Sequence, residues 1–201
     1  MLKKNSTNRI EKNYNKIIKA AFRSIANKGI EKTRINDISR LAGISPGTIY
    51  YYYKNKKELL ISFLDWIMKS YFNGLNKRLQ GNKNPLEKIH CLFQYQKHLI
   101  THEEELEKVM YEFWMMGIKT PYIKIKIKNL LESLKDNVQN IMKEGIEKQI
   151  FKKEASDIFP MIFISLIEGA TFQYLINKDK FTIDKYFDYI ETSVIDLIKI
   201  E

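Results

Sequence analysis

Apolar residues recur at spacings of three and four along almost the whole of this 201-residue chain. The first run shows the pattern clearly: Ile10, Tyr14, Ile17, Ile18, Ala21, Phe22 and Ile25. Only eight glycines and four prolines interrupt the chain, and no Asn-Gly or Asp-Gly turn joins two alternating segments as in a hairpin. Because this spacing places apolar side chains on one face of a helix, the sequence predicts an all-α fold.

The helices can be placed from their start and stop signals. Gly29 and Gly43 stand where glycine ends a helix, and Ser45-Pro46 is an N-cap followed by proline at the first helical position. We expect breaks at 54–55 and 81–85, and an interruption at Pro160. Residues 123–128 alternate like a strand, but the helical spacing extends further, so we favour a helix. The predicted helices are 10–28, 34–42, 46–53, 56–78, 86–101, 103–116, 121–148, 158–176 and 183–200.

Positive charge is concentrated at the N-terminal end. Residues 1–60 hold fourteen Lys and Arg against four Asp and Glu, whereas residues 61–201 hold twenty of each. An AT-rich genome would raise the lysine content everywhere and would not produce this asymmetry. The sequence therefore predicts a polyanion-binding module, residues 1–55, joined to a second domain, residues 56–201.

Several classes of protein are disfavoured by composition. The single cysteine, Cys91, excludes a disulfide framework and a multi-cysteine metal site. We expect no membrane span, because no apolar run approaches the required length, and the polar, basic start lacks the apolar stretch of a secretory signal. We expect a cytoplasmic protein with no membrane partner, no cofactor and no metal.

Residues 33–56 hold the most specific functional signal: a short helix, a tight turn at 41–44 and a second, capped short helix. This is the layout of a helix-turn-helix. The second helix begins with small residues and free backbone N–H groups, which suit phosphate, and its exposed side carries Thr48, Tyr51 and Tyr52, which could reach a major groove. Nearby lysines 54, 56 and 57 could neutralise DNA phosphates.

The same segment resembles the N-terminal domain of TetR/AcrR-family transcriptional regulators. The similarity covers about residues 9–65 and rests on Gly29, Thr33, Ile35, Ile38, the run Ala42-Gly43-Ile44-Ser45-Pro46-Gly47-Thr48-Ile49-Tyr50, and Lys56-Lys57-Glu58-Leu59-Leu60. The resemblance implies a dimeric repressor that binds a palindromic double-stranded DNA operator and responds to a small-molecule effector. By position, the family's DNA contacts fall on Thr33, Arg34, Asn36, Ser45, Pro46, Gly47, Thr48, Tyr50, Tyr51, Tyr52 and Lys56.

The four consecutive tyrosines cannot all face DNA. Tyr50 and Tyr53 are the two that we expect to pack against the first helix as core. Two departures from the family pattern stand here: Ser39 replaces an alanine, and Tyr53 replaces a phenylalanine, so the Tyr53 hydroxyl needs a partner.

The remainder of the chain is rich in aromatic residues and methionine, most of which we expect to be core. Collectively they are compatible with an apolar cavity, and the lack of a concentrated charge cluster favours a hydrophobic or amphipathic effector. His98 and His102 stand four apart, but two histidines alone lack a full ligand set and are expected at the surface. The predicted ligand-binding residues are Trp66, Phe93, Tyr111, Trp114, Met115, Phe163 and Phe172.

Homodimerisation would use the last two helices as halves of a four-helix bundle. The predicted interface residues are Ile167, Gly169, Ala170, Tyr174, Ile190 and Val194; the alternative is a monomer in which these helices bury one another. An enzyme is disfavoured because the phosphate-loop, Gly-x-Ser-x-Gly and His-Glu-x-x-His motifs are missing. A membrane-surface protein would need the apolar face of the first helix, which the motif itself must bury.

Overall fold

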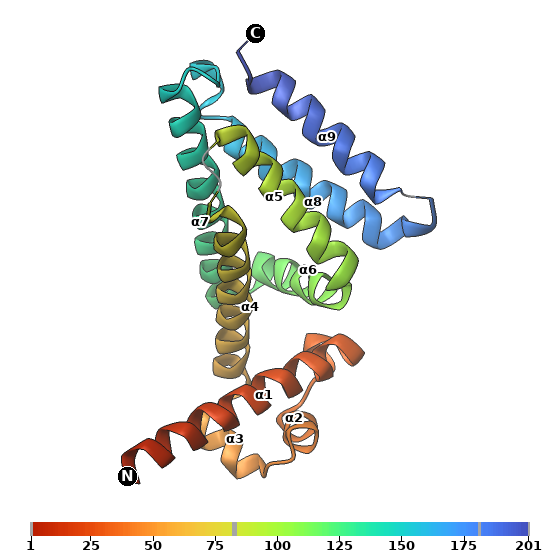
Figure 1. Cartoon of the computed structure of the whole chain (residues 1–201). Coiled ribbons are helices and arrows are strands. Elements are labelled where there is room, and N and C mark those ends of the chain that lie inside the picture. The colour runs from red at the N-terminus through yellow and green to blue at the C-terminus, as the bar shows by residue number, and fades with distance from the viewer. Residues whose placement is uncertain (1, 82–83, 181, 201) are drawn as a thin grey trace. The chain divides into compact units, whose positions relative to one another are not determined.

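The computed structural model describes residues 2–81, 84–180 and 182–200, and the long elements of these ranges are all α-helices (Figure 1). The all-α prediction is confirmed. The α-helices are α1 (Leu2–Lys32), α2 (Ile35–Ala42), α3 (Pro46–Tyr52), α4 (Lys56–Leu79), α5 (Pro85–His102), α6 (Glu104–Lys119), α7 (Pro121–Glu147), α8 (Phe159–Asn177) and α9 (Ile183–Ile198). Two short 3₁₀ turns, η1 (Lys153–Ala155) and η2 (Lys178–Lys180), flank α8.

The observed helices follow the predicted ones closely, with three differences. The first helix starts earlier, at Leu2, and the region of Gly29 is a kink with a φ of 83° inside α1. Pro160 lies in the first turn of α8 and does not interrupt it, because the first turn of a helix needs no proline N–H. The expected break at 81–85 contains Asn82 and Lys83, which lie outside the described residues.

The chain forms two compact units, each assembled from two segments. Unit one comprises Met1–Ser70 and Glu105–Ile127; unit two comprises Tyr71–Glu104 and Lys128–Glu201. The domain boundary expected between residues 55 and 56 would separate the DNA-binding motif from the rest of the chain, and it stays a prediction.

The core of unit one joins the helix-turn-helix to helices that follow it in sequence. Ile17, Ile18 and Ile25 of α1 are buried with Ile38 of α2 and Ile49 of α3. Side chains from α4, α6 and the start of α7 complete this cluster, among them Leu59, Phe63, Phe113 and Ile123. The motif therefore rests on apolar residues from well beyond residue 55.

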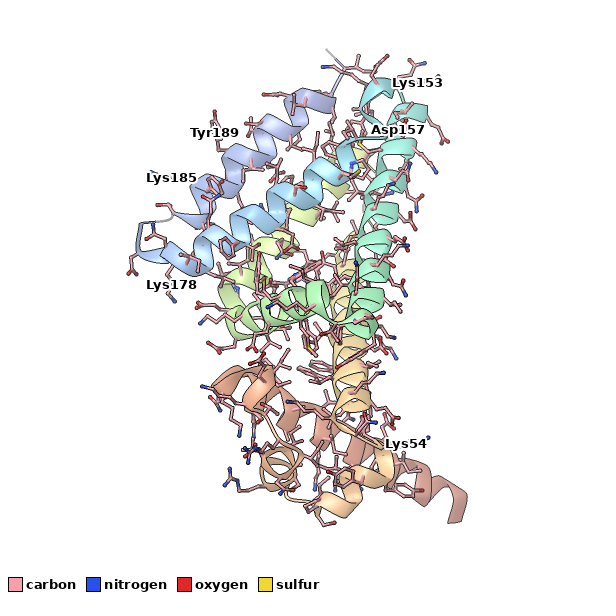
Figure 2. The ribbon with its side chains drawn as sticks, turned by 180° about the vertical axis from the view of Figure 1, so that it is seen from behind. Lys54, Lys153, Asp157, Lys178, Lys185 and Tyr189 are labelled. Carbon is pink, nitrogen blue, oxygen red and sulfur yellow. The ribbon has the colours of Figure 1, made fainter. Side chains whose placement is uncertain are left out.

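In unit two, α5 packs against α8 and α9, which lie side by side (Figures 1 and 2). The Phe93 ring lies 5.0 Å from that of Phe163 and 6.4 Å from that of Phe187, both in edge-to-face arrangements. Such aromatic pairs are favourable beyond their buried area. Phe93 thus ties the three helices together at the centre of the core.

Helix α8 contradicts the expectation that no apolar run approaches the length of a membrane span. With 19 residues and a hydropathy of 1.4 in its most apolar window, it is long and apolar enough to cross a membrane by length and composition alone. One third of that window is buried inside the chain, and Phe163, Ile167 and Ala170 belong to the core of unit two. Core helices of soluble proteins meet the same two criteria, so length and composition assign no membrane here.

Gly145 of α7 provides a stability test of this core, because a Cβ at this position would overlap the Phe151 ring. Alanine normally favours a helix over glycine by about 1 kcal/mol. Here we expect Gly145→Ala to destabilise the protein by about 1–3 kcal/mol, as overpacking does. Urea unfolding monitored by circular dichroism measures this. The control is Asn140→Ala at an exposed position of the same helix, which is expected to be neutral or slightly stabilising.

Candidate nucleic-acid interface

The turn between α2 and α3 is shaped by a left-handed glycine and a serine cap. Gly43 has a φ of 64° and donates its N–H to the carbonyl of Arg40. Only glycine adopts this conformation without steric cost. At the start of α3, Ser45 Oγ accepts a hydrogen bond of 3.1 Å from the Thr48 N–H, and Pro46 occupies the first turn. The predicted cap is confirmed, and it fixes where α3 begins.

Helix α3 is oriented by two inward side chains. Ile49 is fully buried and Tyr53 is 7% exposed. The Tyr53 hydroxyl lies 3.3 Å from Ser62 Oγ, which supplies the partner that this hydroxyl requires. Burial raises the pKa of Tyr53, and the hydrogen bond with Ser62 partly opposes that shift. The prediction that Tyr53 is core is therefore confirmed by its burial.

The expectation that Tyr50 packs as core is wrong, because its side chain is 52% exposed. Tyr51, at 80% exposed, projects furthest from this helix. Tyr52 is half-buried, and its hydroxyl accepts a hydrogen bond of 3.4 Å from the Asn13 side-chain amide of α1. Tyr50 and Tyr51 are thus the tyrosines that a major groove could receive.

Helix α2 is fixed by Asp37, whose carboxylate accepts a 2.9 Å hydrogen bond from the Arg34 N–H and pairs with Lys28. The hydrogen bond from Lys28, followed by that from the Arg34 backbone, lowers the pKa of the Asp37 carboxyl. Ser39 is buried, and its hydroxyl donates to the Asn36 carbonyl. The serine that replaces the family's alanine is therefore accommodated.

The predicted DNA contacts differ in how accessible they are. Exposed are Arg34, Asn36, Ser45, Pro46, Gly47, Tyr50 and Tyr51; half-buried are Thr48, Tyr52 and Lys56. Thr33 is 1% exposed, and its hydroxyl donates to the Gly29 carbonyl 2.9 Å away and lies 3.1 Å from Ser24 Oγ. The Thr33 side chain thus stabilises the end of α1, and its contact with DNA stays a prediction.

Lys56 has two backbone partners at the end of α1. Its ammonium donates to the carbonyls of Ile30, at 2.5 Å, and Glu31, at 3.1 Å. Burial lowers the pKa of this ammonium group. Lys54, in the loop between α3 and α4, is exposed and points into solvent (Figure 2). A phosphate contact by either lysine is a prediction, but only Lys56 also holds two helices together.

A family comparison agrees with this geometry. The profile of the family described as "Bacterial regulatory proteins, tetR family" matches residues 17–63, from the buried face of α1 to the first turns of α4. Residues 17–63 therefore form a DNA-binding domain of the TetR family. The prediction of a helix-turn-helix transcription regulator that binds DNA is confirmed.

Relatives and solved structures extend the similarity to most of the chain. The fatty acid metabolism regulator protein of Bacillus subtilis is 27% identical, over 84% of this chain and 86% of the relative. A TetR transcription regulator from Haloarcula marismortui has the same fold, with a TM-score of 0.85, 16% identity and coverage of 94% and 98%. The regulator FadR from Bacillus subtilis, solved with stearoyl-CoA, has a TM-score of 0.78, 20% identity and coverage of 92% and 99%. These relatives are transcription regulators and not enzymes.

The predicted ligand-binding residues are divided between the two units. Tyr111 and Met115 line a pocket of about 780 Å³ in unit one. Trp66 and Trp114 pack against the core of unit one, and Phe93 and Phe163 are buried in the core of unit two. Phe172 is 53% exposed. A ligand-binding role for these residues stays a prediction.

The sequence interpretation missed the charged side chains of that pocket, six of which are lysines: Lys28, Lys32, Lys56, Lys57, Lys108 and Lys119. They come from three separate helices, α1, α4 and α6, so no stretch of sequence signals them as a cluster. The rings of the neighbouring His98 and His102 stack with their centres 4.5 Å apart. Within the described ranges no group of three or more His, Cys, Asp or Glu could hold a metal ion.

Tyr51→Ala tests the recognition surface. Because the ring is exposed, we expect unchanged thermal stability, and a loss of about 1–3 kcal/mol in operator binding with a smaller loss on random DNA. Fluorescence anisotropy with both DNAs measures this. Tyr53→Ala is the contrasting variant, because it removes a buried ring and is expected to lower the unfolding temperature. Unchanged operator binding by Tyr51→Ala would contradict the assignment.

The variants Lys54→Gln and Lys56→Gln distinguish the contribution of a lysine to DNA binding from its contribution to stability. Each is expected to weaken binding to specific and random DNA about equally and to reduce the salt slope by about one. Only Lys56→Gln should also lower stability, by about 1 kcal/mol or more, because its two carbonyl partners lose a charged donor. Salt titrations and urea unfolding of both variants provide the measurements. Equal stability of the two variants would contradict the role of Lys56 at the end of α1.

Proposed function

We propose that this chain is a ligand-responsive transcriptional repressor that binds a palindromic operator in the cytoplasm as a homodimer. The observation that carries the proposal is the orientation of α3: its buried face is Ile49 and Tyr53, so Tyr50 and Tyr51 point outward beside the Ser45 cap. A helix-turn-helix presents its second helix to the major groove in this way. Two-fold symmetric recognition then requires a second copy of the chain.

The dimer interface that we propose lies on α8 and α9. Four of the six residues predicted from sequence, Ile167, Ala170, Ile190 and Val194, are buried in the core of unit two, and Tyr174 is half-buried against that core. Gly169 is the remaining one, and a Cβ there would meet no atom within 4 Å. The interface must therefore use the exposed side of these helices.

Six large apolar or aromatic side chains lie on that exposed side. We call it the α8–α9 apolar face, and it comprises Met161, Ile162, Phe172, Ile176, Tyr189 and Leu197, each of which is at least 38% exposed. Positions 162, 165, 169, 172 and 176 follow helical spacing, so they form one stripe along α8. Large exposed apolar patches on a protein surface mark interaction sites. Packing two such faces would give a four-helix bundle and would cover the unburied part of α8.

The effector that we propose is a small molecule with an apolar part that releases the repressor from DNA. The named relatives support an apolar part: one regulates fatty acid metabolism, and one structure of similar fold contains stearoyl-CoA. In this chain the pocket lined by Tyr111 and Met115 is the candidate site, since its volume of about 780 Å³ lies in the range of small-molecule sites.

Gly169→Glu tests the dimer. The added side chain meets open space in the single chain, so we expect normal helicity, but in a dimer its charge would be buried without a partner. Sedimentation velocity at micromolar concentration should show a dimer for wild type and a monomer for the variant, with operator binding reduced at least tenfold. Asn140→Glu, exposed on α7, is the control and should stay dimeric. A monomeric wild type, or wild type that partitions into liposomes through α8, would contradict the proposal.

A further inference from the structure

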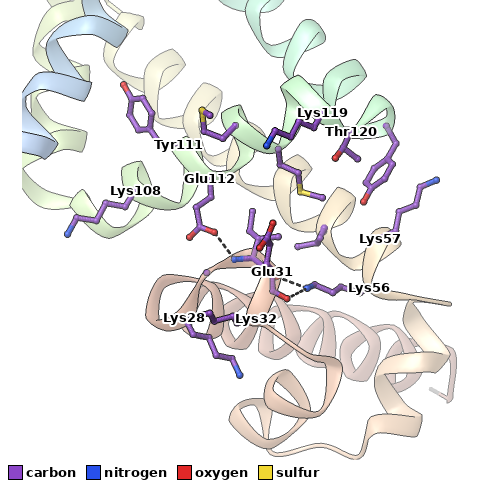
Figure 3. Close-up of a pocket in the computed structure, with 16 residues that line it drawn as sticks. Lys28, Glu31, Lys32, Lys56, Lys57, Lys108, Tyr111, Glu112, Lys119 and Thr120 are labelled. Carbon is purple, nitrogen blue, oxygen red and sulfur yellow. Dashed lines mark hydrogen bonds between the residues drawn. The ribbon is translucent and has the colours of Figure 1, made fainter.

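The pocket in unit one is enclosed by four segments of the chain, shown in Figure 3. The end of α1 supplies Lys28 to Lys32, the start of α4 supplies Lys56, Lys57 and Leu60, and α6 supplies residues from Lys108 to Lys119. Thr120 and Tyr122 come from the start of α7 and the residue before it. All sixteen lining residues belong to unit one.

The lining has a formal charge of +4, from six lysines against the two glutamates Glu31 and Glu112. Several of these charges already have partners. Lys28 pairs with Asp37, Lys108 pairs with Glu105 at 3.0 Å, and Glu112 accepts a hydrogen bond of 2.6 Å from the Ile30 N–H. The positive excess therefore resides in the lysines that have no carboxylate partner.

The side chains of two lysines, Lys32 at the end of α1 and Lys119 at the end of α6, have no hydrogen bond, ion pair or ring contact with the described residues. Lys57 lies 4.5 Å from the centre of the Tyr122 ring, a contact that leaves its charge uncompensated. Like charges that line one concave site repel each other, and a bound anion relieves that repulsion. The electrostatics of the pocket thus favour an anionic group and disfavour a cation.

Most of the rest of the lining is apolar or aromatic. Leu60, Met115, Met116, Tyr111 and Tyr122 contribute, and Met115 is 60% exposed. Methionine side chains are flexible and adapt to apolar ligands of different shape. A purely ionic ligand would leave these surfaces in contact with water, whereas a ligand with an alkyl portion would cover them.

We propose that this pocket binds an anionic amphiphile, a molecule with a phosphate or carboxylate head and an apolar tail. The head is attracted by the lysines of the lining that have no carboxylate partner, Lys32 and Lys119 among them, and the tail lies against Met115, Met116 and Leu60. Lysine is a point charge that does not distinguish phosphate from carboxylate by bidentate geometry, so both heads belong to the class. The binding itself does not rest on the proposed function of the chain.

The pocket also touches the residues that hold the end of α1. Glu112 and Lys56 bond the backbone of Ile30 from two different helices, and both line the pocket. An anionic head would further reduce the positive charge of the unit that contains the helix-turn-helix. Bound amphiphile should therefore weaken DNA binding, and this consequence rests on the proposed function.

Binding can be tested without DNA by isothermal titration calorimetry on the full chain. The probes share one tail: decyl phosphate, decanoate, decyl maltoside and decyltrimethylammonium, each below its critical micelle concentration. We expect decyl phosphate to bind most tightly, decanoate next, and the neutral and cationic probes at least tenfold more weakly. Inorganic phosphate tests the head alone and should bind at least tenfold more weakly than decyl phosphate. Equal affinity for the anionic and cationic probes would overturn the proposal.

Variants locate the site. Lys32→Gln combined with Lys119→Gln should weaken decyl phosphate binding about five- to tenfold, since each exposed charge pair contributes a factor of about two to five. Lys124→Gln, at an exposed position of α7 outside the pocket, removes one charge and should leave the affinity within twofold. Met115→Ala should weaken decyl phosphate and leave inorganic phosphate unchanged. If the double variant binds decyl phosphate as wild type does, the head is not held by these lysines and the proposal is wrong.

A DNA arm separates this inference from the proposed function. Decyl phosphate should weaken operator binding by wild type about five- to tenfold and have less than half that effect on the double lysine variant. Calorimetric binding without any effect on DNA affinity would remove the regulatory consequence and keep the site. Failure of every variant and wild type to bind DNA would contradict the proposed function, while the calorimetry would still decide the pocket.

Discussion

The DNA-binding surface depends on the burial of two side chains of a helix that cannot exist alone. Seven residues are too few for a stable isolated helix, so α3 needs tertiary contacts and a cap. Ile49 and Tyr53 provide the contacts within the core of unit one, and Ser45 provides the cap. Because these three residues fix the start and rotation of α3, they decide that Tyr50 and Tyr51 face outward. Binding of α3 in a major groove depends on that orientation.

Most of the fold could be predicted from the sequence because its signals are local. Gly43 and Ser45 act within one turn of their own position, and apolar spacing defines each helix without knowledge of its neighbours. The error at Tyr50 was avoidable on the same grounds. Residues 49 and 53 are four apart and share a helical face, whereas residue 50 is rotated by about 100° from residue 49. Because Ile49 faces the core, Tyr50 lies outside it.

The sites were harder to predict because they are assembled from distant segments. Phe93 and Phe163 were attractive ligand residues by composition, yet they pack against each other in the core, which is the commoner fate of a large aromatic side chain. The lysine-lined pocket was not predicted because its charged residues are far apart in the sequence. Its charges come from residues 28–32, 56–57, 108 and 119, and a charge count along the chain averages them with the acidic residues of each segment. Only the packing of α6 beside the end of α1 brings them together.

The end of α1 is held by side chains from distant segments of the chain. Helix C-termini leave carbonyls without intrahelical partners, and here Lys56 supplies donors for the carbonyls of Ile30 and Glu31. The Gly29 carbonyl accepts both the backbone N–H and the hydroxyl of Thr33. Glu112 of α6 adds a bond to the Ile30 N–H that the kink at Gly29 makes available.

Gly29 is suited to this junction on two counts. Its φ of 83° is strained for any residue with a Cβ, and an added Cβ would lie 3.2 Å from Glu112 Oε2. The Glu112 contact therefore constrains both the sequence and the conformation of α1. A hydrogen bond to a charged group contributes about 1.5–3 kcal/mol, which is comparable to the coupling free energy of typical allosteric proteins, about 1–3 kcal/mol. This single bond therefore contributes to how α6 holds the end of α1, whose buried face supports the helix-turn-helix.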